Sequence, residues 1–524
     1  MSGPAVELPA RMNAAALLVD ANVEAGRGEK IAIYDVADSS TVTYRDALEM
    51  TNRAGNALRE LGVRMEERVM LLLPDSPAFV FSFFGAIKIG AVPIPTNTLL
   101  KAPDYEYMLN DSRARVLLVH QALLEQIEPI RTRLRYLRQI VVVGRPRGEH
   151  GELVAYDELV NASSPELDPE MMSRDDPCFW LYSSGTTGFP KGAVHLQHDM
   201  IVSADLYARP TLDIDATDRT FSVAKLFFAY GLGNGLYFPF RVGAGTILYP
   251  GKPDPVKFYE IIQEYRPTLF FCVPTGYARM LAVEDAEKRF DTSSLRLCVS
   301  AGEALPPALF ENWRARFGVE ILDGIGSTEI VHIFISNRPG RVKPGSTGEI
   351  VPGYEGRIVD EEGRDAPANE VGDLLIKGDS ICAFYWNKHE KTKETIQGEW
   401  IRTGDKYLRD EDGYFWYQGR SDDMLKVGGM WVSPVEVENA LAEHPAVLES
   451  AVVGVADREG LTKPKAYIVL KDGHEGSPDL SADLQNFVRD RIGVYKYPRW
   501  IEFVSELPKT ATGKTQRYKL RERT

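Results

Sequence analysis

The sequence predicts an α/β fold: a large N-terminal domain with several subdomains, in which helices cover mostly parallel sheets, followed by a small α+β C-terminal domain. In the first half of the chain, short apolar segments typical of strands alternate with segments whose apolar residues recur at helical spacing. This alternation is typical of parallel sheets covered on both faces. After about Trp400 the pattern changes, because glycine and charged residues cluster between residues 403 and 429. The length of 524 residues and the hydrophobic content of 44% are sufficient for two to four domains with a large core.

The expected elements of the first half follow one another in regular order. Apolar residues at helical spacing predict a helix over Thr43–Leu61, with Thr43 as its cap and Gly62 as its stop. The apolar run Arg68–Leu73 predicts a buried strand that ends at Pro74. The same reasoning predicts a helix at Pro77–Ile89, a strand at Ala91–Ile94, a helix around Tyr105–Asp111 and a strand at Val116–Val119.

A second, smaller unit is expected at the end of the chain. Ser433, Pro434 and Glu436 have the pattern of a capping box with proline at the first helical position, which predicts a helix start. The elements expected after it are strands at Ser450–Val455 and Lys465–Leu470, a helix at Leu480–Arg491 and a short strand at Trp500–Val504. We therefore divide the chain into an N-terminal domain, residues 1–420, and a C-terminal domain, residues 421–524. The cleft between them is the expected active site.

Charge and cysteine content narrow the classes of function. The 61 Lys and Arg residues against 75 Asp and Glu residues give a net charge of −14. An acidic chain is a poor general binder of nucleic acid or of an anionic membrane. The four cysteines are far apart and form no CxxC pair, which fits a reducing compartment. Without a targeting signal or a membrane-spanning stretch, a cytoplasmic protein is expected.

Residues 182–192 read YSSGTTGFPKG and carry the main chemical signal. Glycine lets backbone N–H groups approach an anion closely, hydroxyls add donors, and Lys191 adds a positive charge. The segment therefore predicts a loop that wraps a polyphosphate. It is not a Walker A loop, because Phe-Pro separates the last glycine from the lysine. The expected phosphate contacts are Ser183, Ser184, Gly185, Thr186, Thr187 and Gly188.

With this motif the chain resembles the acyl-adenylate-forming enzymes, which include acyl-CoA synthetases, adenylation domains of peptide synthetases and beetle luciferase. The resemblance covers nearly the whole chain, and its further motifs occur in the order of the family. They are AGEALP (301–306), DGIGSTE (323–329), RTGD (402–405), GRSDDMLKVGG (419–429) and PKTATGKTQR (508–517). Within the family, KLFFAYGLGN (225–234) and GSTEIVHIFISN (326–337) resemble the benzoate-CoA ligase branch.

The resemblance implies a two-step reaction: a carboxylate reacts with ATP to give acyl-AMP and pyrophosphate, and CoA then displaces AMP. It implies that Lys514 is the mobile catalytic lysine, that Thr328 and Lys191 contact phosphate, and that Glu329 binds Mg²⁺. Asp323 matches the residue that accepts the adenine amino group, and Asp405, assisted by Arg420, the one that accepts the ribose hydroxyls. The expected nucleotide site is completed by Gly302, Glu303 and Ile325.

The C-terminal domain is expected to rotate between the two steps. The resemblance places the hinge at Asp422 and the pantetheine arm of CoA along Gly428 and Gly429. Lys426 is either a contact to substrate or nucleotide or a solvated surface residue. The oligomeric state, monomer or homodimer, is left open by the sequence.

Two positions depart from the pattern of many relatives. Ile325 stands where many have a tyrosine stacked on adenine, so nucleotide affinity is expected to differ. Gln197 stands where many have a histidine, with His195 and His198 beside it. For both histidines a core or surface position is the expected interpretation.

The resemblance implies that the segment after the phosphate loop, residues 221–240, lines much of the acid's pocket. It is rich in aromatic residues and contains no Asp or Glu, so it offers no partner for an α-ammonium group. A planar, uncharged ring fits such walls. The expected contacts of the aryl acid are Phe228, Ala229, Tyr230, Ala301, Gly326, His332 and Ile333.

Together these features favour an aryl-CoA ligase that uses ATP, Mg²⁺ and CoA and acts on benzoate, 2-aminobenzoate or a hydroxybenzoate. The main alternative is a stand-alone adenylation enzyme that loads a separate carrier protein; because the chain ends ten residues after Lys514, no fused carrier is expected. A non-catalytic binding homologue, a fatty-acid ligase and a luciferase-like oxygenase are the remaining alternatives, and each is less favoured.

Overall fold

The computed structural model describes most of the chain, and the statements that follow concern its described residues alone. These are residues 6–145, 153–183, 189–421, 423–427, 430–457, 461–492, 496–509 and 515–523. The side chains of residues 426, 430 and 431 lie outside the description. Among the described residues, no helix combines the length and the apolar character needed to cross a membrane.

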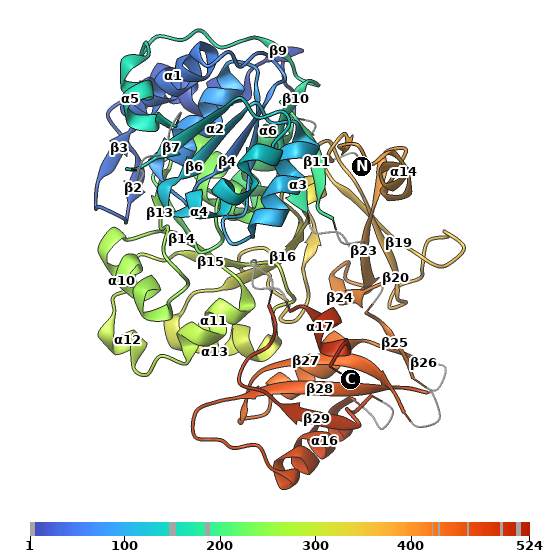
Figure 1. Ribbon diagram of the computed structural model, residues 1–524. Coiled ribbons are helices and arrows are strands. Elements are labelled where there is room, and N and C mark those ends of the chain that lie inside the picture. Colours follow the sequence, from blue (N-terminus) through green and yellow to red (C-terminus); the bar gives the residue numbers. More distant parts are fainter. Residues whose placement is uncertain are drawn as a thin grey trace.

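Two sheets with parallel cores form the larger part of the N-terminal domain (Figure 1). The first is wholly parallel, in the order β5 (Val92–Pro95), β4 (Arg68–Leu72), β6 (Val116–His120), β7 (Gln139–Val143) and β8 (Val154–Ala155). The second has nine strands, in the order β18 (Glu349–Ile350), β17 (Ile333–Ser336), β16 (Ile321–Gly326), β15 (Leu297–Ser300), β14 (Leu269–Cys272), β12 (Arg219–Ser222), β13 (Gly245–Leu248), β2 (Ile31–Asp35) and β3 (Thr41–Thr43). Its strands from β16 to β2 are parallel and only the strands at its two edges are antiparallel.

Helices cover these sheets as the alternating sequence pattern predicts. Helix α1 (Tyr44–Glu60) begins with a capping box between Thr43 and Asp46, and α2 (Pro77–Lys88) is buried along most of its length. The two helices pack closely because each has a glycine at the contact: a Cβ added to Gly85 would lie 2.7 Å from the backbone nitrogen of Gly55. The other helices of this domain are α3 (Ala102–Ser112), α4 (Leu124–Ile127), α5 (Tyr156–Ala162), α6 (Asp199–Ser203), α7 (Arg209–Leu212), α8 (Ala229–Leu232), α9 (Phe238–Val242), α10 (Pro255–Tyr265), α11 (Pro274–Leu281), α12 (Ala286–Arg289), α13 (Pro307–Phe317) and α14 (His389–Thr395).

Smaller antiparallel sheets connect this domain to the end of the chain. Strands β19 (Glu355–Val359), β20 (Gly372–Lys377), β23 (Trp400–Arg409) and β22 (Ile396–Gln397) form one sheet, with β24 (Phe415–Arg420) paired to β23. Strands β10 (Pro177–Ser183), β11 (Lys191–Leu196) and β21 (Phe384–Tyr385) form another, and β1 (Arg11–Met12) pairs with β9 (Met172–Ser173). The hairpin of β10 and β11 therefore flanks the predicted phosphate loop.

The C-terminal elements, orange to red in Figure 1, gather at one end of the molecule. They comprise the hairpin of β25 (Leu425–Val427) and β26 (Met430–Val432), the sheet of β27 (Val447–Ala456), β28 (Thr462–Leu470) and β29 (Trp500–Phe503), and helices α15 (Pro434–Ala442), α16 (Pro478–Ile492) and α17 (Arg517–Arg521). A separate apolar cluster, which includes Val437, Val452, Ile468 and Leu484, holds them together. The predicted fold class, with a large N-terminal and a small C-terminal domain, is confirmed.

One local expectation needs a correction. Ser433 caps α15 as predicted, since its hydroxyl accepts the N–H of Glu436 at 3.2 Å. The reciprocal half of the capping box is not formed, because the Glu436 carboxylate pairs with Lys496 instead. A capping residue loses this role when a distant lysine offers its carboxylate a stronger, charged partner.

Candidate active site at the junction of the domains

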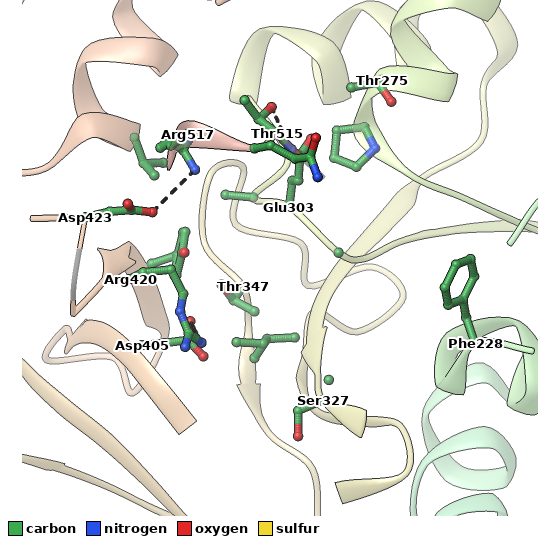
Figure 2. Close-up of a pocket in the computed structure, with 18 of the residues that line it drawn as sticks. Phe228, Thr275, Glu303, Ser327, Thr347, Asp405, Arg420, Asp423, Thr515 and Arg517 are labelled. Carbon is green, nitrogen blue, oxygen red and sulfur yellow. Dashed lines mark hydrogen bonds and ion pairs between the residues drawn. The ribbon is translucent and has the colours of Figure 1, made fainter. Parts of the chain in front are cut away.

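A cleft of about 1720 Å³ lies where the two domains meet. Its floor is built from segments that follow the carboxyl ends of β14, β15 and β16, and its rim includes β23, β24, α15 and residues 515–518. Figure 2 shows residues of both domains directed into it, with Glu303, Ser327 and Phe228 from one and Thr515 and Arg517 from the other. The carboxyl edge of a parallel sheet is the usual place for ligand binding in α/β proteins.

The cleft brings together many of the residues that the sequence singled out. Those lining it are Ser183, Lys191, Phe228, Gly302, Glu303, Asp323, Ile325, Gly326, Thr328, Glu329, Asp405 and Arg420. Several other predicted residues lie outside the described part of the chain: Ser184, Gly185, Thr186, Thr187, Gly188, Asp422, Gly428, Gly429 and Lys514, together with the side chain of Lys426.

Glu329 is the centre of a polar cluster on the floor. Its Oε1 accepts the hydroxyl of Tyr385 at 2.7 Å and that of Ser183 at 3.2 Å, and Lys191 Nζ lies 3.9 Å from the same oxygen. Lys191 in turn lies 4.3 Å from the centre of the Tyr385 ring. Three side chains from three strands thus surround one carboxylate, which is carried by a short 3-10 helix (Thr328–Ile330).

The electrostatics of this cluster keep Glu329 charged. Burial by itself raises the pKa of Glu329, but the charge of Lys191 and the hydrogen bonds from Tyr385 and Ser183 together lower it below its ordinary value. Burial lowers the pKa of Lys191, and Glu329 opposes this. The result is a partly buried carboxylate–ammonium pair in the cleft, with the carboxylate in its anionic form at neutral pH.

A charged carboxylate of this kind fits Mg²⁺. The three contacts described above are made by Oε1, so the side chains of the described residues named there leave Oε2 to a cation. Within the described ranges, no group of three or more His, Cys, Asp and Glu side chains forms a metal site. One protein carboxylate is nevertheless sufficient, because Mg²⁺ is commonly held by one or two carboxylates, water and substrate phosphates.

His195 holds the backbone of the segment that carries Glu329. Its ring is buried, its Nδ1 pairs with Asp199 Oδ2 at 2.7 Å, and the carbonyl oxygen of Thr328 accepts from its Nε2 at 2.8 Å. His195 is therefore a core residue, as expected, but one that fixes the backbone next to Glu329. His198 is nearer the surface and lies 2.8 and 2.9 Å from the carbonyl oxygens of Arg174 and Asp379. Gln197 is buried and accepts the N–H of Ala14 at 2.9 Å.

The cleft also has acceptors suited to a nucleoside. Asp323 is buried; its Oδ2 accepts the N–H of Leu305 at 3.3 Å, while its Oδ1 has no partner among the described residues. Burial raises the pKa of Asp323 well above its usual range. An unpaired buried acceptor of this type fits an amino group of a ligand, since leaving it unpaired is costly.

Asp405 and Arg420 face each other across strands β23 and β24. Their backbones are register partners, and Arg420 donates to Asp405 Oδ1 at 3.1 Å. Ile325 lies on β16 between Asp323 and the polar floor and is partly exposed to the cleft. An aliphatic side chain here provides an apolar surface without an aromatic face.

Glu303, which the sequence places in the nucleotide site, lines the cleft and also contacts the C-terminal domain. Its Oε1 accepts the backbone N–H of Thr515 at 2.9 Å and the Thr515 hydroxyl at 3.2 Å. The carboxylate thus joins the N-terminal floor to the C-terminal domain. Gly302, before it, adopts φ of +97°, a conformation that favours glycine and turns the chain into the cleft.

The expected acid-binding residues surround a buried histidine behind the floor. Ala301, His332 and Ile333 are almost wholly buried and are not part of the lining of the large cleft that the described residues form. The Tyr230 hydroxyl donates to the carbonyl of Val299 at 3.1 Å, so it is engaged by the protein, and Ala229 beside it is partly buried.

His332 itself is neutral. The Asn234 Oδ1 and the carbonyl oxygen of Tyr230 lie 3.0 and 3.2 Å from its Nε2. Both are acceptors, so Nε2 carries the hydrogen. Burial lowers the pKa of His332 to about 3, against a smaller opposite effect of the hydrogen bond to Tyr230. Four aromatic rings pack around it, those of Tyr207, Tyr230, Tyr237 and Phe238, at 4.5 to 6.4 Å between centroids.

Two residues of the site carried no signal in the sequence. Tyr385 lies on a short edge strand outside every motif, and it reaches Glu329 because β21 pairs with β11, the strand that begins at Lys191. Asp199 is four residues after His195, a spacing typical of ion pairs on one helix face. That spacing could have indicated the pair, but here His195 is on a strand and Asp199 begins α6.

Comparison with known proteins agrees with this geometry. A family model described as AMP-binding enzyme matches residues 19–386, and one described as AMP-binding enzyme C-terminal domain matches residues 436–514. The benzoate–CoA ligase of Thauera aromatica is 51% identical over 520 residues, which cover 99% of this chain and 97% of that protein.

Solved structures are similar over the same length. The anthranilate CoA ligase AuaEII, in complex with anthranoyl-AMP, has a TM-score of 0.95 and 48% identity and covers 98% of both chains. A benzoate CoA ligase from Burkholderia xenovorans LB400 has a TM-score of 0.90 and 46% identity, with 97% of this chain and 100% of that chain covered. The chain therefore belongs to the AMP-binding, acyl-adenylate-forming enzyme family.

Proposed function

We propose that this protein is an ATP-dependent aryl-CoA ligase. It activates a benzoate-type acid as aryl-AMP with release of pyrophosphate and then transfers the acyl group to CoA. The observation that carries the proposal is the charged Glu329–Lys191 pair on the floor of a cleft between two domains. The names of the relatives in Thauera aromatica and Burkholderia xenovorans indicate the kind of acid.

In the first step the acid's carboxylate oxygen bonds to the α-phosphorus of ATP, and the bond from that phosphorus to the bridging oxygen breaks as pyrophosphate leaves. Because two anions approach each other, cations and hydrogen-bond donors must offset their charge. We assign this role to Lys191, to Thr328 and to Lys514. Glu329 would hold Mg²⁺, which supplies positive charge against the phosphate oxygens.

The nucleotide is assigned to the same cleft, with its phosphates near Glu329. Asp323 Oδ1 would accept the adenine amino group, and Asp405, fixed by Arg420, the ribose hydroxyls. Ile325 would pack on the base. Ser183 and the loop of Ser184, Gly185, Thr186, Thr187 and Gly188 would donate to the phosphates, and Gly302 would allow the backbone to approach the nucleotide closely.

The second step needs a different arrangement of the C-terminal domain. The CoA thiolate attacks the acyl carbonyl, AMP leaves, and Lys514 is no longer needed at the site. We propose that residues 421–524 move as one unit about Asp422, since this part has its own apolar core. Gly428 and Gly429 would then lie along the pantetheine arm, with Lys426 close to it.

The acid is assigned to the space between the floor and the buried His332. Phe228, Ala229 and Tyr230 would form one wall, Ala301 and Gly326 the floor, and His332 and Ile333 the far end. The sequence segment 221–240 has no acidic side chain, so an amino acid with a cationic α-amine lacks a partner there. Benzoate, 2-aminobenzoate and hydroxybenzoates are the acids that suit this environment.

The test is pyrophosphate release with a panel of acids, with and without CoA. Benzoate, 2-aminobenzoate, 3- and 4-hydroxybenzoate, hexanoate and phenylalanine should be compared by kcat/KM. We expect at least one benzoate to exceed hexanoate and phenylalanine, and an aryl-CoA product when CoA is present. Preference for hexanoate or phenylalanine would exclude an aryl substrate, and aryl-AMP formation without transfer to CoA would favour a carrier protein as acceptor.

A further inference from the structure

The Glu303–Thr515 contact joins the two domains at the edge of the cleft. Glu303 is the third residue after β15, and Thr515 lies two residues before α17. One carboxylate oxygen accepts two bonds from the same residue, from the backbone N–H at 2.9 Å and from the hydroxyl at 3.2 Å. In Figure 2 the two side chains lie next to each other at the boundary. Bonds to a charged acceptor are stronger than neutral ones, and two of them fix direction as well as distance.

Thr515 belongs to a short paired segment of the C-terminal domain. It forms a bridge with Lys509, and the N–H of Gln516 donates to the carbonyl of Pro508 at 2.7 Å. Residues 508–509 and 515–516 are therefore held side by side, so a contact to Thr515 fixes both stretches at the boundary of the domains.

Lys509, the bridge partner of Thr515, has a weaker connection to the N-terminal domain. Lys509 Nζ lies 2.6 Å from Glu449 Oε2, and Arg279 of α11 reaches Glu449 Oε1 at 4.0 Å. The Arg279 side chain is 55% exposed, so solvent screens this pair. Of these two contacts between the described residues of the domains, the Glu303–Thr515 contact is therefore stronger than the Arg279–Glu449 pair.

We propose that Glu303 is a positioning residue for the first half-reaction: its carboxylate holds Thr515, and with it the C-terminal domain, against the N-terminal domain in the arrangement that forms the adenylate. The role in catalysis rests on the proposed two-step function, whereas the contact itself does not. The carboxylate acts on the C-terminal domain and not on the nucleotide. Both bonds are lost when the C-terminal domain turns away, so Glu303 favours adenylate formation and contributes nothing to thioester formation.

Three substitutions separate the bonds. Glu303→Ala removes both and is expected to slow adenylate formation, measured as single-turnover pyrophosphate release with benzoate and ATP, roughly tenfold to hundredfold. Glu303→Gln keeps an oxygen acceptor of the same reach and should lose less. Thr515→Val removes only the hydroxyl donor and should cost up to about tenfold. CoA thioester formation from synthetic benzoyl-AMP should stay within about twofold in all three.

A double-mutant cycle tests whether the two residues act through each other. If they do, Thr515→Val has no further effect in the Glu303→Ala background. The matched control is Glu311→Ala, which removes an exposed carboxylate from α13 in the same region of the chain and should change neither half-reaction. Additive losses, or an equal loss in both half-reactions, would overturn the proposal, as would a loss seen only as a higher KM for ATP.

A measurement without turnover keeps this test separate from the proposed function. Spin labels at Lys288→Cys and Glu475→Cys, both exposed and in different domains, report the distance between the domains. The four native cysteines are buried and should not be labelled. Glu303→Ala should reduce the population at the distance seen in the wild type, and an unchanged distribution would contradict the contact. If the wild type forms no aryl-AMP, the proposed function fails while the distances still decide the role of Glu303.

Discussion

Glu303 and Glu329 occupy equivalent places in the sheet but have different partners. Each is the third residue after a strand, β15 and β16, and these strands are parallel neighbours. Glu329 is held by Ser183, Lys191 and Tyr385, all in its own domain. Glu303 is held by Thr515 of the other domain. The same side chain at the same sheet edge is therefore part of a fixed floor in one case and of a separable contact in the other.

The two carboxylates differ in which arrangements of the domains they could serve. If residues 421–524 rotate as proposed, a residue surrounded by its own domain would keep its partners in both arrangements and could serve both half-reactions. A residue whose partner belongs to the C-terminal domain could serve only one of them. Substitutions in the floor and at the contacts between the domains test this contrast.

Glu329→Gln should have the largest effect. It removes the charge that fits Mg²⁺ and leaves Lys191 without its anionic partner, so adenylate formation should fall roughly 10²- to 10³-fold. Pyrophosphate release at several Mg²⁺ concentrations measures it, and a higher requirement for Mg²⁺ should accompany the loss. Tyr385→Phe, which keeps the charge and removes one hydrogen bond, should lose about tenfold. If Glu329→Gln retained most of its activity, the floor would not be the chemical centre.

His195→Leu should lower the free energy of unfolding, because His195 holds the backbone next to Glu329. Asp199 would remain buried without its main partner, and removal of one member of a buried pair costs about 3 kcal/mol of unfolding free energy. Urea unfolding followed by tryptophan fluorescence measures the loss. His198→Leu is the control: that side chain is nearer the surface, and Asp199 keeps His195. Equal losses of unfolding free energy in the two variants would show that the buried contacts of His195 with Asp199 and Thr328 contribute no more stability than the contacts of His198.

Acid should weaken the floor through His332. Its pKa in the folded protein is about 3, below the value of 6.5 for an unperturbed histidine, so the unfolded state binds the proton first. The stability that the neutral ring contributes is complete above pH 6.5 and is lost as the pH falls towards 3, at about 1.4 kcal/mol per pH unit. Unfolding free energies of wild type and His332→Gln between pH 7 and 5 should differ in slope. Exposed His474→Gln should leave the slope unchanged.

Much of this architecture could be predicted from local signals. Helix α1 was expected from its cap and periodicity, and it begins after Thr43 and ends at Glu60. Strand β4 was expected from one apolar run and ends one residue before the expected position. Such elements depend on neighbours in sequence, so their patterns are visible in the chain itself. The fold class followed from the alternation of strand-like and helical segments and the family from motifs in their order, and both are confirmed.

Contacts between distant residues could not be predicted in this way. Tyr385 and Glu329 are brought together by the pairing of β21 with β11, and Glu303 and Thr515 by the docking of two domains. The missing half of the α15 capping box has the same cause, because Lys496, sixty residues away, takes the carboxylate of Glu436. The sequence indicated what kind of contact each side chain can make, but it did not indicate which distant residue makes that contact.

The smallest expected effect concerns the second contact between the domains. Arg279→Ala removes a side chain that is 55% exposed and lies 4.0 Å from Glu449, so a pair of this kind is worth at most about 1 kcal/mol. Adenylate formation should fall no more than about fivefold at low salt, and the difference from wild type should vanish at about 1 M salt, where the Debye length is about 3 Å. Lys509 remains paired with Glu449 in the variant, so the pairing of residues 508–509 with 515–516 is unchanged. A loss as large as that of Glu303→Ala would mean that the domains are joined by a distributed charged surface, and the contrast between Glu303 and Glu329 would then be one of degree.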